Sequence, residues 1–279
     1  MLIIDLHYIA WRAYHSTGSL SSNGKPTGVI YGVLRDLHSL MEMFPDPVIV
    51  IAADSKNSLR KKLFPGYKLR PEEKDPIEKR ARKEAVEQIM ALKREILPAI
   101  GFRNLFEFDG FEADDIMAEL VLRKAHHEPP VIVTGDEDMF QLLYHCDMYI
   151  PQKTQHYTFE DFVVEYPGME PSDWATYKAL AGCSSDTVPG VPGIGPKNAV
   201  LEILGKLPAG KKKDVILQAR KDGTFALMRK LVTLPFPGLP EMKLRPFRFN
   251  QQAFDGVCRK YEFKHLKWGV KCQMQDRRY

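Results

Sequence analysis

Cysteine is scarce in this 279-residue sequence, and its four cysteines form no C-x-x-C pair. The sequence therefore indicates neither a zinc ribbon nor a disulfide framework, and we expect reduced thiols. No apolar run is long enough to cross a membrane, and the first residues, MLIIDLHYIAWRAYH, lack the basic start and long apolar core of an export signal. We expect a cytoplasmic protein without membrane association.

A large excess of charge of either sign is also missing, because the formal net charge is only +4. The basic residues are nevertheless unevenly distributed. One patch extends from Arg60 to Lys83, and a second begins after Lys206 and includes Arg277 and Arg278. Basic patches that flank an acidic cluster suit a phosphate polymer as partner. Each patch taken alone is equally consistent with a solvated helix face.

Acidic residues gather in the segment 111–143, FEADDIMAELVLRKAHHEPPVIVTGDEDMFQLL. Its pattern predicts a helix, a turn, a short β-branched strand at 131–133 and a second turn. Carboxylates fall at the helix start and just after the strand: Glu112, Asp114, Asp115, Asp136 and Asp138. Because ligands bind beyond the carboxyl ends of strands in open α/β sheets, these acids form a candidate divalent-cation site. An EADD run by itself is more often a solvated helix start.

Two further apolar runs end in an aspartate. Residues 2–4 predict a buried strand that leads into Asp5, and residues 47–53 predict a second buried strand that leads into Asp54. An amphipathic helix is expected between them, at 25–43. Three strand-terminal aspartates in one sheet repel one another unless a cation binds between them. Oxygen ligands without a histidine cluster favour Mg²⁺ or Mn²⁺ over Zn²⁺.

The segment 63–97 begins with a stretch too charged to be core. Three prolines interrupt that stretch, and apolar residues at helical spacing then predict a helix at 77–97. We expect an insertion that leaves the sheet and returns, and that holds basic side chains over the acidic cluster.

A glycine-rich string, LAGCSSDTVPGVPGIGPKNA, occupies residues 180–199. Gly190, Gly193 and Gly195 predict a hairpin with uncovered backbone amides, and Pro196 is expected to open a helix that continues to residue 204. Such a turn presents N–H groups and a helix N-terminus to an anion. The whole string fits a helix-hairpin-helix that holds a DNA phosphate without reading bases.

These motifs occur in an order that resembles the 5′ nuclease or flap endonuclease family, which includes the 5′ to 3′ exonuclease domain of bacterial DNA polymerase I and phage 5′ exonucleases. The resemblance runs from Ile3 to about Trp268. It rests on Asp5 with YIAWRAYH, Asp54 with SLRKKLFPGYKLRP, FEADD, VTGDEDMFQLL, GCSSDTVPGVPGIGPKNA, RKLVTL and YEFKHL.

The resemblance implies an α/β fold in which a central, mostly parallel sheet forms a PIN-like 5′ nuclease core. Residues 1–165 would form this core, with a helical arch inserted at about 66–97. Residues 166–279 would form a helical DNA-binding region with the helix-hairpin-helix at about 180–204.

The resemblance also implies roles for individual residues. The first metal ion would be held by Asp5, Asp54, Glu112, Asp114 and Asp115. The second would be held by Asp136, Asp138 and Asp186. Lys68 and Arg70 would polarise the scissile phosphate, and Tyr67 would stack on the terminal base, with simple packing of this ring as the alternative. Further DNA contacts are implied for Arg60, Gly190, Gly193, Gly195 and Lys197, and a K⁺ ion at the hairpin is compatible with the resemblance.

The sequence departs from the family pattern ahead of the hairpin, where the usual motif is Gly-Asp-x-x-Asp-Asn. Cys183 stands in place of the first aspartate and Thr187 in place of the asparagine. A thiol is a soft donor that suits Mg²⁺ poorly, so we expect a weakened second metal site. Leu6 replaces the glycine that usually follows the first aspartate, and nothing in the sequence explains this change.

The expected function is therefore that of a 5′ to 3′ exonuclease or flap endonuclease, which hydrolyses DNA phosphodiester bonds near 5′ ends, flaps or branches with two divalent ions. We expect a monomer and, without a polymerase segment, a free-standing nuclease. Two alternatives stay open. A structure-specific DNA-binding protein without catalysis is favoured by Cys183 and opposed by the intact acids. A PIN-type ribonuclease is opposed by the hairpin and the basic tail.

Overall fold

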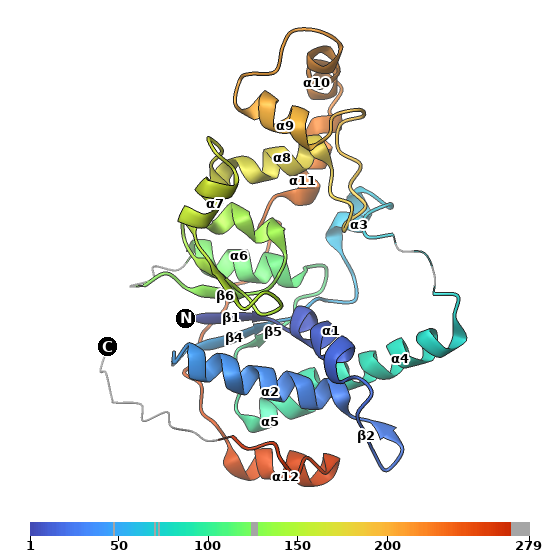
Figure 1. The fold of residues 1–279 in the computed structure, drawn as a ribbon, viewed down its shortest axis with the longest axis vertical. Coiled ribbons are helices and arrows are strands. Elements are labelled where there is room, and N and C mark those ends of the chain that lie inside the picture. The colour runs from blue at the N-terminus through green and yellow to red at the C-terminus, as the bar shows by residue number, and fades with distance from the viewer. Residues whose placement is uncertain (47, 70, 72, 124–127, 269–279) are drawn as a thin grey trace.

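The structure, a computed structural model, describes residues 1–268 except 47, 70, 72 and 124–127. At its centre lies a six-stranded sheet (Figure 1). In spatial order the strands are β5 (Leu105–Phe106), β4 (Ile49–Ala52), β1 (Leu2–Asp5), β6 (Val131–Val133), β7 (Asp147–Ile150) and β8 (Gln155–Tyr157). β8 pairs antiparallel with β7, and the other strands of this sheet pair in parallel. The expected mostly parallel sheet is confirmed.

Helices cover both faces of the sheet. One face is covered by α1 (Leu6–Thr17), α2 (Gly28–Met43) and α5 (Leu97–Ile100), and the other by α6 (Ala113–Arg123) and α7 (Phe159–Glu165) (Figure 1). Ile4 belongs to the first of these cores and Ile3 to the second, because side chains alternate along a strand. Burial on both faces explains why the strands are continuous apolar runs in the sequence.

The helix expected at 25–43 begins three residues later than predicted. Lys25–Pro26 (β3) pairs antiparallel with Ser21–Ser22 (β2) in a short hairpin, and α2 then begins at Gly28. The backbone amides at this point are satisfied by the hairpin and by the α1–α2 connection, for example from Gly28 N to Leu20 O at 3.1 Å. Strand pairing in the hairpin therefore prevents residues 25–27 from joining the helix.

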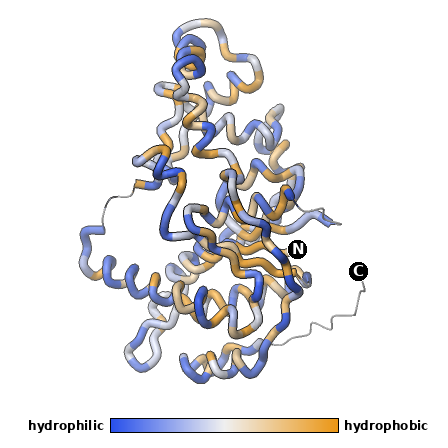
Figure 2. Tube along the Cα trace, turned by 180° about the vertical axis from the view of Figure 1, so that it is seen from behind, coloured by the Kyte–Doolittle hydropathy of each residue, from blue (hydrophilic) through white to orange (hydrophobic). Residues whose placement is uncertain are grey.

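The helix α3 (Leu59–Leu63) precedes the predicted insertion, which contains α4 (Pro76–Ala91) and a π-helical turn (Leu92–Ile96) that leads into α5. The first part of α4 projects from the body and is largely hydrophilic (Figures 1 and 2). Its second part belongs to the core, because Ala85 and Ile89 are buried. The side chain of Gln88 accepts hydrogen bonds from the first amides of α2 at 3.0 and 3.3 Å. The described part of this segment therefore projects from the body at the start of α4 and packs in the α2 core at its end.

The carboxyl half divides between opposite ends of the molecule (Figure 1). At one end lie α8 (Trp174–Ala181), α9 (Pro196–Ile203), α10 (Lys211–Lys221) and α11 (Thr224–Val232), and at the other end lies α12 (Gln251–Tyr261). In the connecting chain, Phe236 packs in the α6 core and Phe247 packs in the α2 core, which Phe254 of α12 and Trp268 after it also join. The carboxyl half is therefore not one separate helical body, and a boundary at residue 165 stays a prediction.

Three cysteines, Cys146, Cys183 and Cys258, are free thiols. Cys272, Arg277 and Arg278 lie outside the described residues. Within the described part of the chain, no helix combines the length and the apolar character needed to cross a membrane.

Candidate metal centre

Four aspartates lie at one edge of the sheet, and we call them the first group: Asp5, Asp54, Asp114 and Asp136. Asp5 ends β1, Asp54 follows β4, and Asp136 follows β6. These strands are parallel neighbours, so their carboxyl ends share one edge. Asp114, in the first turn of α6, is close enough to the other members to interact electrostatically with them. The edge predicted from the sequence therefore exists.

Local hydrogen bonds orient two of these carboxylates. Asp5 accepts from the amide of Tyr8 at 3.0 Å and from the hydroxyl of Thr134 at 3.2 Å. Asp54 accepts from the amide of Ala113 at 2.8 Å, which ties the end of β4 to the start of α6. Each carboxylate keeps further lone pairs, because a carboxylate can accept about four hydrogen bonds.

The electrostatics of the first group favour a bound cation. Burial, together with the charges of Asp54 and Asp136, raises the pKa of Asp5 to about 7. Burial and the charge of Asp136 raise the pKa of Asp114 well above its ordinary value. Within the described residues, no lysine or arginine forms an ion pair with a member of this group. The clustered negative charge is thus a good match for a divalent ion with oxygen ligands.

Glu112 lies beside the first group but has a cationic partner. Lys68 Nζ is 2.8 Å from Glu112 Oε2, and the hydroxyls of Tyr67 and Ser58 donate to the carboxylate, each at 2.9 Å. Burial alone would raise the pKa of Glu112, but the charges of Lys68 and Arg60 outweigh it and hold this pKa below its ordinary value. Glu112 is therefore ionised and held in place before any metal binds.

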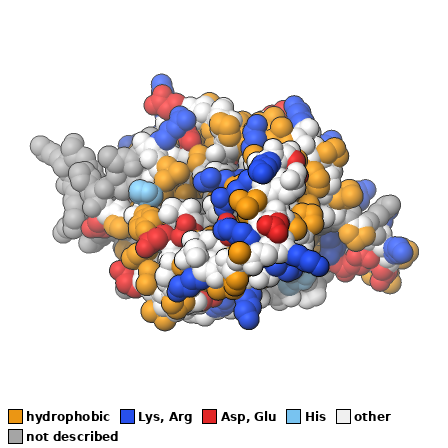
Figure 3. Space-filling model, turned by 90° about the horizontal axis from the view of Figure 1, so that it is seen from above, with side chains coloured by type: hydrophobic (Ala, Val, Ile, Leu, Met, Phe, Trp, Pro, Cys, Tyr) orange, Lys and Arg blue, Asp and Glu red, His pale blue; other side chains and the backbone are white. Residues whose placement is uncertain are grey.

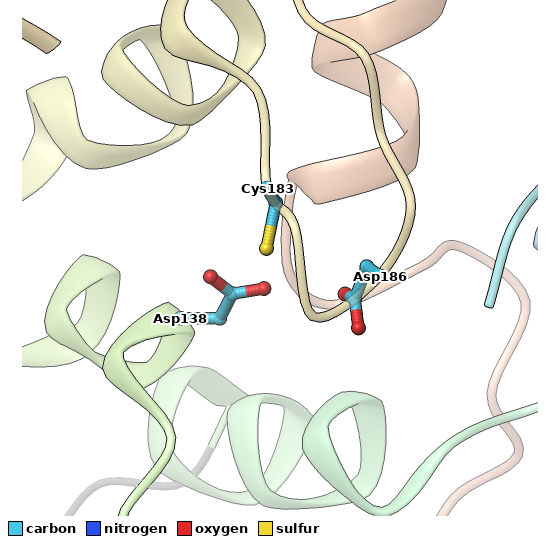
Figure 4. Close-up of side chains that lie close together, drawn as sticks. All are labelled: Asp138, Cys183 and Asp186. Carbon is cyan, nitrogen blue, oxygen red and sulfur yellow. The ribbon is translucent and has the colours of Figure 1, made fainter. Parts of the chain in front are cut away.

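A second group of side chains, Asp138, Cys183 and Asp186, converges next to the first (Figure 4). One donor atom from each residue lies within 4.8 Å of the others, and all three residues are buried. Cys183 is positioned by an antiparallel bridge to Val188. Burial and the neighbouring charge of Asp136 raise the pKa of Asp138 to about 6. The Cys183 thiol thus lies beside Asp138 and Asp186, at the position where the family resemblance implies an aspartate.

The glycine-rich string forms a loop between α8 and α9. Its apolar residues Val191 and Ile194 are buried, and the amide of Val191 donates to Leu180 O at 2.9 Å. This anchoring leaves Gly193 and Lys197 exposed on the surface. Gly190 packs so closely that an added Cβ would lie 2.4 Å from the amide of Gly182. A helix begins at Pro196, as predicted, and ends at Ile203, one residue before the predicted end.

Comparison with known proteins bears directly on this arrangement. A sequence profile of the family described as "5'-3' exonuclease, N-terminal resolvase-like domain" matches residues 1–167. The 5'-3' exonuclease of Aquifex aeolicus is 34% identical over 205 residues, which cover 72% of this chain and 67% of that protein. This chain belongs to the 5′-3′ exonuclease family.

Longer relatives and solved structures extend the comparison. The thermostable DNA polymerase I of Thermus aquaticus is 33% identical over 214 residues, which cover 75% of this chain and only 24% of the polymerase. A crystal structure of the bacteriophage T5 D15 flap endonuclease with DNA and metal ions has a TM-score of 0.65 at 22% identity, over 85% of this chain and 89% of that chain. The latter likeness confirms the fold of this exonuclease family member.

Two predicted site residues have a different role in this exonuclease family member. Asp115 is fully buried and forms a bidentate ion pair with Arg60, at 2.6 and 2.7 Å. Asp115 also accepts from the amides of Glu112 and Phe236, at 3.1 and 2.7 Å. A metal ligand at Asp115 and a DNA contact at Arg60 stay predictions, and in this structure the two side chains bind each other instead. The two side chains satisfy each other and join α3 and α6 to the chain after α11.

Tyr67 is also placed differently from the prediction. Its ring is 2% exposed and packs among Ala179, Cys183 and Met228, so it offers no face to a DNA base. This burial favours the alternative of simple packing, and the Tyr67 hydroxyl donates to Glu112. Lys68 does face the acids, as expected, whereas Arg70 lies outside the described residues.

Sequence reasoning missed three side chains that support the site. His7 Nδ1 accepts the amide of Asp54 at 3.2 Å, and burial lowers the pKa of His7, which suits a neutral acceptor. Thr134 donates to Asp5. Lys178 reaches the second group from α8, with Nζ 3.1 Å from Asp138 Oδ1. A lysine in an ordinary amphipathic helix carries no motif, so only the packing of α8 reveals it.

Proposed function

We propose that this chain is a divalent-metal-dependent 5′ nuclease that hydrolyses DNA phosphodiester bonds near 5′ ends, flaps or branches. The first group carries the proposal: four carboxylates gather at the sheet edge of an exonuclease-family fold, and no lysine or arginine among the described residues forms an ion pair with them. The bacteriophage T5 relative, whose structure contains DNA and metal ions, supports the same assignment.

The donor atoms of the first group fit Mg²⁺ or Mn²⁺, since both prefer carboxylate oxygens. We assign the first ion to Asp5, Asp54, Asp114 and Asp136 with Glu112, and we assign any second ion to Asp138 and Asp186. A divalent ion at such a site activates water and neutralises charge on a phosphate. Lys68 contributes a fixed positive charge between Glu112 and Asp186, at 2.8 and 3.6 Å from their oxygens.

We assign the grip on duplex DNA to the helical end of the molecule. Lysine and arginine side chains gather over the middle of this face (Figure 3). The loop between α8 and α9 offers Gly193, Gly195 and Lys197, and the ammonium of Lys212 donates to the carbonyl of Gly193. Backbone contacts of this kind bind phosphates without reading sequence. The insertion at 66–97 would accommodate the 5′ strand, and a K⁺ ion at the loop belongs to the same proposal.

The decisive experiment is digestion of a 5′-labelled flap substrate with Mg²⁺ and with EDTA. We expect cleavage near the branch only with Mg²⁺, and loss of cleavage in Asp54→Asn with flap binding in Ca²⁺ kept. Asp255→Asn, in α12 at the opposite end of the molecule, is the matched control and should cleave like the wild type.

Two other results would redirect the assignment. Flap binding without cleavage at any Mg²⁺ or Mn²⁺ concentration would indicate a DNA-binding protein that has lost catalysis. Preferential cleavage of single-stranded RNA would indicate a PIN-type ribonuclease.

We also propose that the protein is a monomer and acts in the cytoplasm. Light scattering of the purified chain tests the first proposal, and cell fractionation tests the second.

A further inference from the structure

The second group has a composition that suits a divalent ion poorly. Two of its members, Asp138 and Asp186, are carboxylates, but the third is the Cys183 thiol (Figure 4). Hard cations such as Mg²⁺ prefer oxygen, and a thiol is a soft donor. Cys183 therefore adds no hard ligand to the group.

A cation from the protein already lies at this group. Lys178 Nζ is 3.1 Å from Asp138 Oδ1, 3.9 Å from Cys183 Sγ and 3.9 Å from Glu137 Oε2. The side chain of Lys178 is only 11% exposed, and its ammonium lies 5.6 Å from the centre of the Trp174 ring. Contacts on these sides hold the ammonium at the group instead of in solvent.

The other carboxylate of the second group also has a lysine. Lys68 Nζ is 3.6 Å from Asp186 Oδ1, and the amide of Lys68 donates to Asp186 O at 2.8 Å. Each carboxylate of the group is thus paired with one ammonium. A divalent ion would have to displace Lys178 or overcome its repulsion, which the short distance makes strong in a buried place.

We propose that the Lys178 ammonium takes the place of a second divalent cation between Asp138 and Cys183, so that the chain holds one divalent ion tightly, at the first group. The inference rests on the proposed function and specifies its metal requirement. A positive charge on a tethered side chain does not dissociate when the metal concentration falls. The rival role for Lys178 is packing against Trp174 alone, without influence on metal binding.

The test is the number and affinity of Mn²⁺ ions bound by the full chain without DNA, measured by calorimetry and by electron paramagnetic resonance. The wild type should bind one ion at least about tenfold more tightly than any second ion. Lys178→Met should tighten the second ion by about tenfold, and Lys178→Met with Cys183→Asp should tighten it further. Lys178→Arg keeps the charge and should bind like the wild type.

A matched control is Lys213→Met, because Lys213 pairs with the buried carboxylate of Glu202 at 2.6 Å, away from the acids of the sheet edge. It should leave Mn²⁺ binding unchanged.

Thermal melts add a second measurement: Lys178→Met should melt lower than the wild type in EDTA, and Mn²⁺ should restore its stability. If Lys178→Met folds only with Mn²⁺, this result would also support the inference, because the ion would replace the lost ammonium charge.

Two ions of equal affinity in the wild type would overturn the inference, whatever the variants do. An unchanged second affinity in folded Lys178→Met would overturn it as well, in favour of packing alone. Neither outcome would contradict the proposed function, because the chain would still bind the first ion and cleave DNA. A chain that neither binds a first ion nor cleaves DNA would overturn the proposed function and the inference with it.

Discussion

The first and second groups lie side by side but differ in how their charge is balanced. In the first, Asp5 is buried, the other three aspartates are half-buried, and the pKa of Asp5 rises to about 7. In the second, Lys178 and Lys68 lie 3.1 and 3.6 Å from the carboxylates of Asp138 and Asp186. Burying an unpaired charge is costly, so the first group gains most from a bound ion. We therefore expect the two groups of acids to differ in how strongly they bind a metal ion.

The largest effect is expected from removing one charge of the first group, in Asp114→Asn. Cleavage should fall at least about a hundredfold, because a metal ion contributes several kcal/mol of charge stabilisation. The melting temperature in EDTA should rise, because the substitution relieves repulsion between neighbouring carboxylates. Rates on a flap substrate and melts in EDTA and Mg²⁺ measure both effects. Wild-type cleavage by this variant would remove Asp114 from the metal site.

The neighbouring aspartate should behave in the opposite way. Asp115→Asn leaves the buried guanidinium of Arg60 without its counter-charge and should lower the free energy of unfolding by about 3–5 kcal/mol. Arg60→Met should cost a similar amount, and the double substitution should cost less than the sum. Chemical denaturation of the three variants forms a double-mutant cycle. Stability unchanged in Asp115→Asn would contradict the structural role and restore the metal-ligand prediction.

A smaller effect is expected when the second group is given an oxygen ligand, in Cys183→Asp. The Mg²⁺ concentration for half-maximal cleavage should fall by about tenfold or less, since Lys178 still opposes a second ion. Cys183→Ser, which is similar in size and uncharged, serves as the control and should leave the midpoint unchanged. A lower melting temperature with an unchanged titration would show that Cys183 only packs, as buried cysteines often do.

The smallest effect is expected at the loop between α8 and α9, which belongs to neither the first nor the second group. Gly195 has an extended backbone, and nothing lies within 4 Å of an added Cβ, so Gly195→Val should fold normally. If a phosphate approaches these amides, the variant should bind every duplex several-fold more weakly, without a change in sequence preference. Gly193→Val is a strained comparison, because φ is 75° there. Full affinity in folded Gly195→Val would place the DNA elsewhere.

The sequence by itself determined the strands β1, β4 and β6, the start of α6, and the aspartates that follow or precede them. Apolar runs and helical spacing are local properties, and parallel strands necessarily bring their carboxyl ends to one edge. The family motif ahead of the hairpin also identified Cys183 as a replacement for the usual aspartate. These features follow from residues near one another in the chain.

The tertiary structure alone decided which of these acids remain unpaired. Arg60 meets Asp115 across 55 residues of sequence, and Lys178 meets Asp138 only because α8 packs on the turn after β6. An ion pair depends on distance and burial, which neither composition nor periodicity encodes. For the same reason the sequence left open whether Tyr67 stacks on a base or packs, whereas in the folded chain its ring is buried and its hydroxyl donates to Glu112.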